Sequence, residues 1–286
     1  MKSVASSIFA LLIVGCAGAE GGSVVLSDNV APLASTTASP IPGWSHVKTL
    51  KGTVRDFSNS HDDFDMSCGG YTVMPGGLQS TLPCSGKPQL ATSAASACLS
   101  TQANFDQWFS DVSGVNYSFP SEYVFAGGTA TAGYATFKNL PVNDLGFGND
   151  VDGTAGDGLN YLYTAEFHGW LQYNGGSREE LWVTADDDAW VYINDKLAVD
   201  LGGLHGPKTA SVNLMTLGLT AGRRYRIDVF YAERGAVMAQ LEMVAPSDPI
   251  DFVEPNGVPL WPRTKCSLIE PMKPSHTIND EPVYRD

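Results

Sequence analysis

Basic residues are scarce in this chain. Of its 286 residues only 17 are Lys or Arg, against 31 Asp or Glu, and the formal net charge is −14. This imbalance excludes a nucleic acid or an anionic membrane surface as the main partner, because proteins bind both through basic side chains. Cations are the small partners that an acidic chain favours. The hydrophobic share of 43% is enough for a sizeable core.

Long apolar runs are also missing, apart from residues 4–14. That run follows Met1-Lys2 and has the length of a signal-peptide core, well short of a membrane span. It leads into Ile13-Val14-Gly15-Cys16, which resembles the lipobox of bacterial lipoproteins. We therefore expect residues 1–15 to be a signal peptide and Cys16 to carry lipid. Cleavage after Ala17 or Ala19 is the alternative, and both interpretations predict export.

Cysteine is sparse, with five residues in the whole chain. If Cys16 is lipidated, an even set remains for two disulfides in an oxidising compartment. The candidates are Cys68, Cys84, Cys98 and Cys266. Three pairings are open. Because Cys266 lies far from the others in sequence, at least one bridge is expected to tie the C-terminal tail to the N-terminal part.

The chain divides into four predicted parts. Residues 1–15 form the signal peptide, residues 16–47 a small, polar, flexible tether, residues 48–246 one folded domain, and residues 247–286 a Pro-rich tail that a disulfide partly holds. The domain consists of short alternating or β-branched runs separated by Gly, Asn and Asp, with a helical pattern only around residues 105–112. This pattern predicts an all-β fold, an antiparallel sandwich or barrel with a short helix and long loops.

Three consecutive carboxylates are the strongest local signal. Asp186, Asp187 and Asp188 stand between two strand-like runs, and a predicted hairpin turn at Asn194-Asp195 follows the second run. Like charges this close raise one another's pKa unless a cation lies among them. Oxygen ligands suit a hard cation such as calcium. The alternative interpretation is a solvated, ion-free turn.

Several separated blocks of sequence point to a known family. They are 52–57 (GTVRDF), 61–64 (HDDF), 86–88 (GKP), 105–109 (FDQWF), 160–161 (NY), 164–167 (TAEF), 186–194 (DDDAWVYIN), 200–205 (DLGGLH) and 229–234 (VFYAER). In this order they resemble the fibro-slime domain, a member of the PA14-like β-sandwich group of secreted and surface proteins. The resemblance covers roughly two thirds of the chain and implies a PA14-like sandwich.

The resemblance also implies a site. In PA14-like lectins an Asp-Asp pair, often joined by a cis peptide, holds a calcium ion that ligates sugar hydroxyls; here the matching pair is Asp186-Asp187, with Asp188 as an additional candidate ligand. Trp190 and His205 are the candidates for contact with the sugar, although aromatic strand residues usually pack inward and a lone loop histidine is usually structural.

A second loop departs from the family pattern. In the related adhesins it adds an Asn side chain and backbone carbonyls to the ion, whereas residues 235–239 here read GAVMA. Backbone carbonyls and water would then have to complete the shell. Glu233-Arg234, just before this loop, is interpreted as a charge pair that closes a strand end.

Two functions follow from these patterns. The first is a non-enzymatic, lipid-anchored surface protein of the bacterial envelope, in the outer membrane or on the cell surface, or else secreted, that uses calcium to bind a glycan or extracellular matrix. The alternative is a structural matrix or envelope component that acts through protein contacts without a calcium site. An enzyme is not expected, because contiguous aspartates do not give the separation that glycosidases need, and the sequence has no nucleophile elbow, zinc spacing or phosphate loop.

Overall fold

The computed structural model of the chain describes the middle of the sequence. The described residues are 44–46, 49–64, 72–91, 98–124, 126–127, 133–137, 143–149, 159–175, 180–235, 239–245 and 250–255. The chain divides into two units, residues 1–39 and 40–286, and all the described residues belong to the second. The predicted signal peptide, Cys16 and most of the predicted tether and tail therefore lie outside the described residues.

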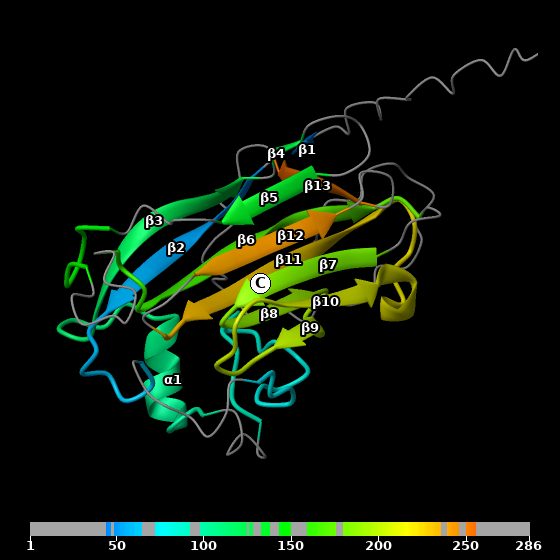
Figure 1. The fold of residues 1–286 in the computed structure, drawn as a ribbon. Coiled ribbons are helices and arrows are strands. Elements are labelled where there is room, and N and C mark those ends of the chain that lie inside the picture. Colours follow the sequence, from blue (N-terminus) through cyan, green and yellow to red (C-terminus); the bar gives the residue numbers. More distant parts are fainter. Residues whose placement is uncertain are drawn as a thin grey trace, which may run out of the picture. The chain divides into compact units, whose positions relative to one another are not determined.

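The larger of two antiparallel sheets has eight strands within the described residues (Figure 1). They are β1 (Trp44–His46), β2 (Thr49–Phe57), β3 (Asn116–Val124), β6 (Tyr163–Tyr173), β8 (Asp188–Ile193), β9 (Lys196–Leu201), β11 (Arg223–Glu233) and β13 (Ile250–Pro255). The order along the sheet is β1-β13-β6-β11-β8-β9, and β2 pairs with both β6 and β3. The long central strands β6 and β11 form the middle of this sheet.

The second sheet has five described strands in the order β10-β7-β12-β5-β4. They are β4 (Ala126–Gly127), β5 (Gly133–Phe137), β7 (Glu180–Asp186), β10 (Lys208–Asn213) and β12 (Gln240–Ala245); a 3-10 turn, η2 (Leu214–Leu217), follows β10. Every described pairing in it is antiparallel. The prediction of an all-β antiparallel fold is confirmed.

The main core lies between the two sheets. Leu181, Val183 and Ala185 alternate along β7 and are fully buried in this core, as their period of two predicts. Burial of a Leu or Val side chain stabilises the fold by about 1.5–3 kcal/mol. Trp182, on the opposite face of β7, is 45% exposed. The predicted turn at Asn194-Asp195 is present, with φ values of 52° and 61°.

A second core covers the outer face of the larger sheet. It is formed by described residues within 57–64, 78–82 and 99–109, the last of which include α1 (Gln102–Trp108). The Thr101 side chain caps this helix by accepting a hydrogen bond from Asn104 N at 3.0 Å. Phe105 and Trp108 are fully buried and pack their rings against Trp190 of β8. The helix begins three residues before the predicted range and ends at Trp108.

The cysteines differ from the prediction. Cys84 is free and exposed, in a turn closed by the hydrogen bond from Gly86 N to Pro83 O at 2.8 Å. Cys98 is disulfide-bonded, and its partner lies outside the described residues, as do Cys68 and Cys266. The expectation of two bridges among the four cysteines is wrong, because the turn holds Cys84 at the surface as a free thiol.

Among the described residues no helix has both the length and the apolar character needed to cross a membrane.

Candidate metal centre

Three carboxylates converge at one end of the sandwich. Asp186 ends β7, Asp187 is the single residue between β7 and β8, and Glu233 ends β11. One oxygen from each side chain lies within 4.8 Å of the other two, and all three residues are buried. The Asp186-Asp187 peptide bond is cis, as the family resemblance implied. We call these three residues the acid cluster.

Hydrogen bonds from the backbone orient the acid cluster. Asp187 Oδ1 accepts from His205 N at 2.7 Å, and its Oδ2 accepts from Arg234 N at 3.1 Å. Glu233 Oε1 accepts from Gly235 N at 3.1 Å. A Cβ placed on Gly235 would lie 3.7 Å from Asp187 Oδ2 and from Glu233 Oε1, so the start of the predicted second loop borders the cluster. Residues 236–238 of that loop lie outside the described residues.

Tyr231, on the same strand as Glu233, also contacts the acid cluster. The Tyr231 hydroxyl donates to the Asp186 carbonyl oxygen and lies 3.3 Å from Glu233 Oε2. Tyr231 is fully buried, and burial raises the pKa of its hydroxyl well above 10, so it stays a neutral donor. Glu233 is therefore held at Oε1 by Gly235 N, and its Oε2 lies beside the Tyr231 hydroxyl.

Electrostatics in the acid cluster are unfavourable without a cation. Burial, and then the charge of Asp187, raise the pKa of Asp186 to about 7. Burial, and then the charges of Asp187 and Asp186, raise the pKa of Glu233 well above its ordinary value. Within the described part of the chain no Lys or Arg forms an ion pair with these three carboxylates. A bound cation would remove this repulsion and favour the charged form of each group.

The third aspartate has a different role. Asp188 Oδ2 accepts from Arg234 Nε at 2.7 Å, and both side chains are fully buried. Arg234 also donates to the carbonyl oxygen of Cys98 at 3.0 Å and lies over the Trp108 ring, 5.1 Å from its centroid. Asp188 thus has a permanent counter-ion, and its carboxylate is not part of the acid cluster.

The two candidate sugar contacts are internal. Trp190 is fully buried, and its indole N–H donates to Asp200 Oδ1 at 3.0 Å. His205 is 1% exposed, with its ring nitrogens 3.0 Å from Leu201 O and 2.9 Å from Gly206 O. Neither ring presents a face to solvent, which corrects the expectation that they contact a sugar. His205 contributes through its backbone amide, which binds Asp187.

Glu233 is the residue that the sequence interpretation missed. Its neighbour Arg234 suggested a local charge pair, but the guanidinium pairs with Asp188 and leaves Glu233 to the acid cluster. The signal that could have identified Glu233 is the pairing register of β11 with β8. Ala232 of β11 lies opposite Asp188 of β8, so the residue after Ala232 stands beside the acidic loop. The alternative of a solvated turn is wrong, because all three aspartates are buried.

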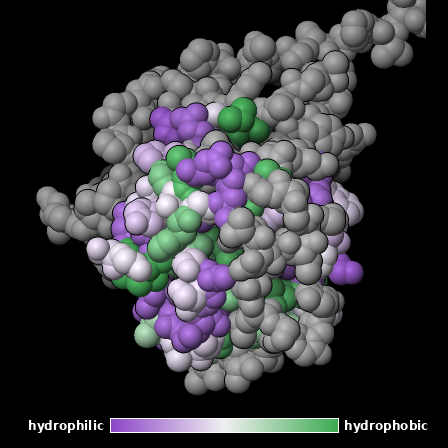
Figure 2. Space-filling model, turned by 60° about the vertical axis from the view of Figure 1, so that its left-hand side comes forward, coloured by the Kyte–Doolittle hydropathy of each residue, from purple (hydrophilic) through white to green (hydrophobic). Residues whose placement is uncertain are grey.

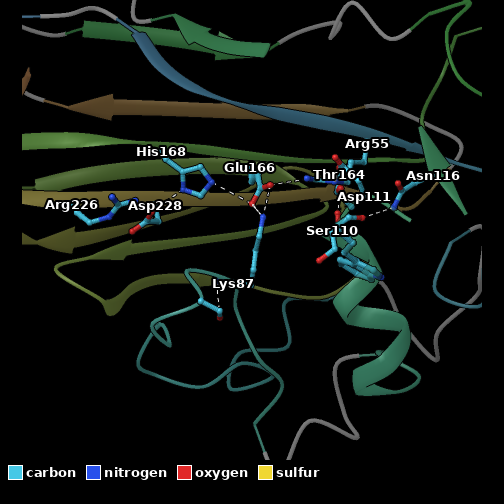
Figure 3. A network of polar contacts seen from close by, with 12 residues as sticks. Arg55, Lys87, Ser110, Asp111, Asn116, Thr164, Glu166, His168, Arg226 and Asp228 are labelled. Carbon is cyan, nitrogen blue, oxygen red and sulfur yellow. Dashed lines mark hydrogen bonds and ion pairs between the residues drawn. The ribbon is translucent and has the colours of Figure 1, made fainter. Parts of the chain in front are cut away.

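A separate ionic network lies on the outer face of the larger sheet (Figure 3). At its centre, Glu166 binds Arg55 at 2.8 Å and Lys87 at 2.5 Å, and Nε2 of His168 lies 3.3 Å away. Burial opposes the charge of Glu166, but the hydrogen bond and charge of His168, with Lys87 and Arg55, lower its pKa to about 2. Glu166 is therefore an ionised partner of basic groups and is unsuited to be a general acid.

One family of domains matches part of the chain. The family model described as the PA14 domain matches residues 111–248. This segment contains both strands that supply the acidic loop and the strand that ends in Glu233.

Similar sequences occur in Dictyostelium discoideum. Protein psiJ is 34% identical over 211 residues, which cover 65% of this chain and 29% of psiJ. Protein psiC is 34% identical over 150 residues, which cover 50% of this chain and 29% of psiC. Protein psiD is 30% identical over 205 residues, which cover 68% of this chain and 40% of psiD. The matched region is less than half the length of each of these curated relatives.

Solved structures show only a distant similarity. A PA14 sugar-binding domain from an RTX adhesin is 13% identical, with a TM-score of 0.25, and the match covers 46% of this chain and 74% of that one. A β-glucosidase from Kluyveromyces marxianus in complex with glucose is 17% identical, with a TM-score of 0.21. The match covers 29% of this chain and 10% of the β-glucosidase chain.

Proposed function

We propose that this chain is an exported surface protein that binds carbohydrate with the help of a calcium ion held by Asp186, Asp187 and Glu233. The observation that carries the proposal is the convergence of these three buried carboxylates, which have no basic partner among the described residues. The PA14 match over residues 111–248 supports a carbohydrate-binding role rather than an enzymatic one. Export, and a lipid anchor at Cys16, remain part of the proposal on the strength of the N-terminal sequence.

The donor set fits calcium. Calcium binds oxygen at about 2.3–2.6 Å, so two ligand atoms on opposite sides of one ion are at most about 5 Å apart. The three oxygens of the acid cluster, within 4.8 Å of one another, meet that limit. Three carboxylates fill about half of the six to eight positions that calcium takes. Backbone carbonyls, water and sugar hydroxyls are the remaining oxygen ligands available to it.

The protein's own residues position this site before any ligand binds. The amides of His205 and Arg234 each bind one oxygen of Asp187, the Gly235 amide binds Glu233, and the Tyr231 hydroxyl binds the Asp186 carbonyl oxygen. Each carboxylate oxygen retains further acceptor capacity for an ion. The calcium ion, when bound, supplies positive charge and open coordination positions for hydroxyl groups.

Isothermal titration of the full chain with calcium tests the metal site. We expect binding by the wild type and none by Asp187→Asn, which keeps the shape of the side chain but removes its charge. Glu180→Gln is the matched control, since Glu180 is an exposed carboxylate at the other end of β7, and it should bind calcium like the wild type. Absence of calcium binding by the wild type would overturn the proposed site.

A glycan array, probed with and without a calcium chelator, tests the function. We expect signals that the chelator removes and that Asp187→Asn lacks. Calcium binding without any chelator-sensitive glycan signal would contradict carbohydrate binding and favour a component that acts through protein contacts.

A further inference from the structure

Two aromatic rings lie exposed and in contact at the same end of the sandwich as the acid cluster. Tyr117, near the start of β3, is 50% exposed, and Phe147, in the loop 143–149, is 44% exposed. Their ring centroids are 4.8 Å apart and the ring planes meet at 68°. The rings therefore form a corner open to solvent. Because Phe147 is 44% exposed, it forgoes part of the about 1.5–3 kcal/mol that full burial of a Phe contributes.

The loop that presents Phe147 is held firmly. Buried Asp56 accepts a hydrogen bond from Phe147 N and another from Asn160 Nδ2, both at 2.6 Å. Gly146, with φ +62°, passes so close that a Cβ on it would lie 2.2 Å from Asp56 Oδ2. Only glycine fits there, and buried Asp56 fixes this exposed loop through its hydrogen bond to Phe147 N. The exposed position of Phe147 is thus built into the fold.

A second set of bonds closes the loop on itself. Asn149 Oδ1 accepts from Asp144 N at 2.7 Å, and Asn149 Nδ2 donates to Asp144 Oδ1 at 2.8 Å. Asp144, on the same loop as Phe147, is exposed, and only its Oδ1 is used by Asn149. The loop that carries Phe147 therefore also presents a carboxylate that is able to hydrogen-bond a ligand.

Strand register fixes where the corner lies relative to the acid cluster. Glu233 of β11 is opposite Tyr163 of β6, Tyr163 is opposite Asp56 of β2, and Asp56 is opposite Tyr117 of β3. The four residues form one row across the end of the larger sheet, where β2 and β11 both finish (Figure 1). Three steps of strand spacing separate Glu233 from Tyr117, roughly 14 Å.

A sugar ring fits this corner better than a protein surface does. A stable protein interface buries about 800 Å² on each partner around an apolar centre. The exposed large apolar residues of this loop are only Phe147 and Leu145 among those described, and Figure 2 shows hydrophobic and hydrophilic residues interspersed on the side of the molecule that it turns forward. A pyranose ring has an apolar C–H face and a polar rim, which match two aromatic rings and the exposed Asp144 carboxylate on the loop that carries Phe147.

We propose that Tyr117 and Phe147 form an aromatic subsite that binds a sugar ring of the same carbohydrate chain whose other end lies at the acid cluster. This inference rests on the proposed function. It assigns the ligand to oligosaccharides, because one monosaccharide does not span the roughly 14 Å between the two places.

The experiment measures affinity in calcium for a glycan identified on the array, as the monosaccharide and as oligosaccharides of increasing length. Tyr117→Ser and Phe147→Ser are the test variants. Trp182→Ser, an exposed aromatic on the outer face of the other sheet, is the control. We expect each test variant to weaken oligosaccharide binding about tenfold, or about 1.4 kcal/mol, with monosaccharide and calcium binding unchanged. Trp182→Ser should match the wild type.

The outcomes separate this inference from the function on which it rests. Calcium-dependent glycan binding that both test variants retain at full strength would overturn the subsite and leave the proposed function intact. An equal loss for the monosaccharide and the oligosaccharide would also overturn it, since the corner would then not be a separate contact. Absence of any chelator-sensitive glycan binding by the wild type would overturn both proposals.

Discussion

Arg234 Nε donates to Asp188 Oδ2 at 2.7 Å, and both side chains are fully buried. This pair divides three consecutive aspartates into two kinds. Asp188 has Arg234 as its counter-ion. Asp186 and Asp187 instead join Glu233 in the acid cluster, which has no basic counter-ion among the described residues. The same guanidinium contacts the Cys98 carbonyl and the Trp108 ring, so it also attaches residues 98–108 to the sheet.

Arg234→Met should destabilise the protein by about 3–5 kcal/mol, because it removes the counter-ion of Asp188 in the interior, where burial already raises the pKa of that carboxyl. Urea denaturation followed by tryptophan fluorescence measures this change. The double variant Arg234→Met, Asp188→Asn should recover part of the loss. If the single variant and the wild type have the same urea midpoint of unfolding, the ion pair does not hold the acidic loop in place.

Glu166→Gln should also destabilise the fold, by about 1–3 kcal/mol, since Arg55, Lys87 and His168 would lose the charge of the carboxylate they share, while Arg55 keeps Asp111 and His168 keeps Asp228. Its calcium affinity should remain that of the wild type once folded, because Glu166 lies in the network on the outer face and not in the acid cluster (Figure 3). Loss of calcium binding at full stability would contradict this separation of roles.

His168 should make stability depend on pH. Burial lowers the pKa of His168, but hydrogen bonds to Asp228 and Glu166 outweigh burial and raise it above 6.5. Its stabilising contribution is therefore complete below about pH 6.5 and is lost as pH rises through the folded-state pKa. Each pKa unit of difference is worth about 1.4 kcal/mol.

Urea denaturation from pH 5.5 to 8.5 measures this dependence. The free energy of unfolding of His168→Gln should fall below that of the wild type most strongly at the acidic end of the range, and the gap should narrow as pH rises. A gap that stays constant across the range would mean that His168 binds Asp228 and Glu166 as a neutral ring.

Gly52→Ala should disrupt the pairing of β2 with β6. A Cβ on Gly52 would lie 1.7 Å from the backbone oxygen of Glu166, which cannot move away without breaking the sheet. The expected loss exceeds the about 1–3 kcal/mol of ordinary overpacking. Gly206→Ala is the control, since a Cβ there meets nothing within 4 Å, and it should change stability by less than about 0.5 kcal/mol. Equal melting temperatures for the two variants would contradict the close approach.

Cys84 should react with a thiol-specific alkylating reagent in the native protein, because it is free and exposed. Peptide mapping by mass spectrometry should find the label on the peptide that contains Cys84 and none on the peptide that contains Cys98, which is disulfide-bonded. Cys84→Ser should leave the melting temperature unchanged. A labelled Cys98, or an unreactive Cys84, would show that the thiols are arranged differently.

Sequence alone determined the local architecture. Alternation with a period of two placed Leu181, Val183 and Ala185 in the core, and Asn194-Asp195 made a tight turn, because strand pleating and turn preferences depend on neighbouring residues. The family resemblance added the Asp186-Asp187 pair as the place to look for a cation.

Only the tertiary structure decided which residues share the site. Glu233 is 46 positions from Asp187 in the numbering, and strand pairing brings it beside the acidic loop, while Arg234 removes Asp188 from it. Phe105 and Trp108 of α1 pack against Trp190, which the sequence offered as a candidate sugar contact at a position where aromatic residues usually pack inward. Long-range pairing and burial depend on the whole chain at once, so neighbouring residues do not encode them.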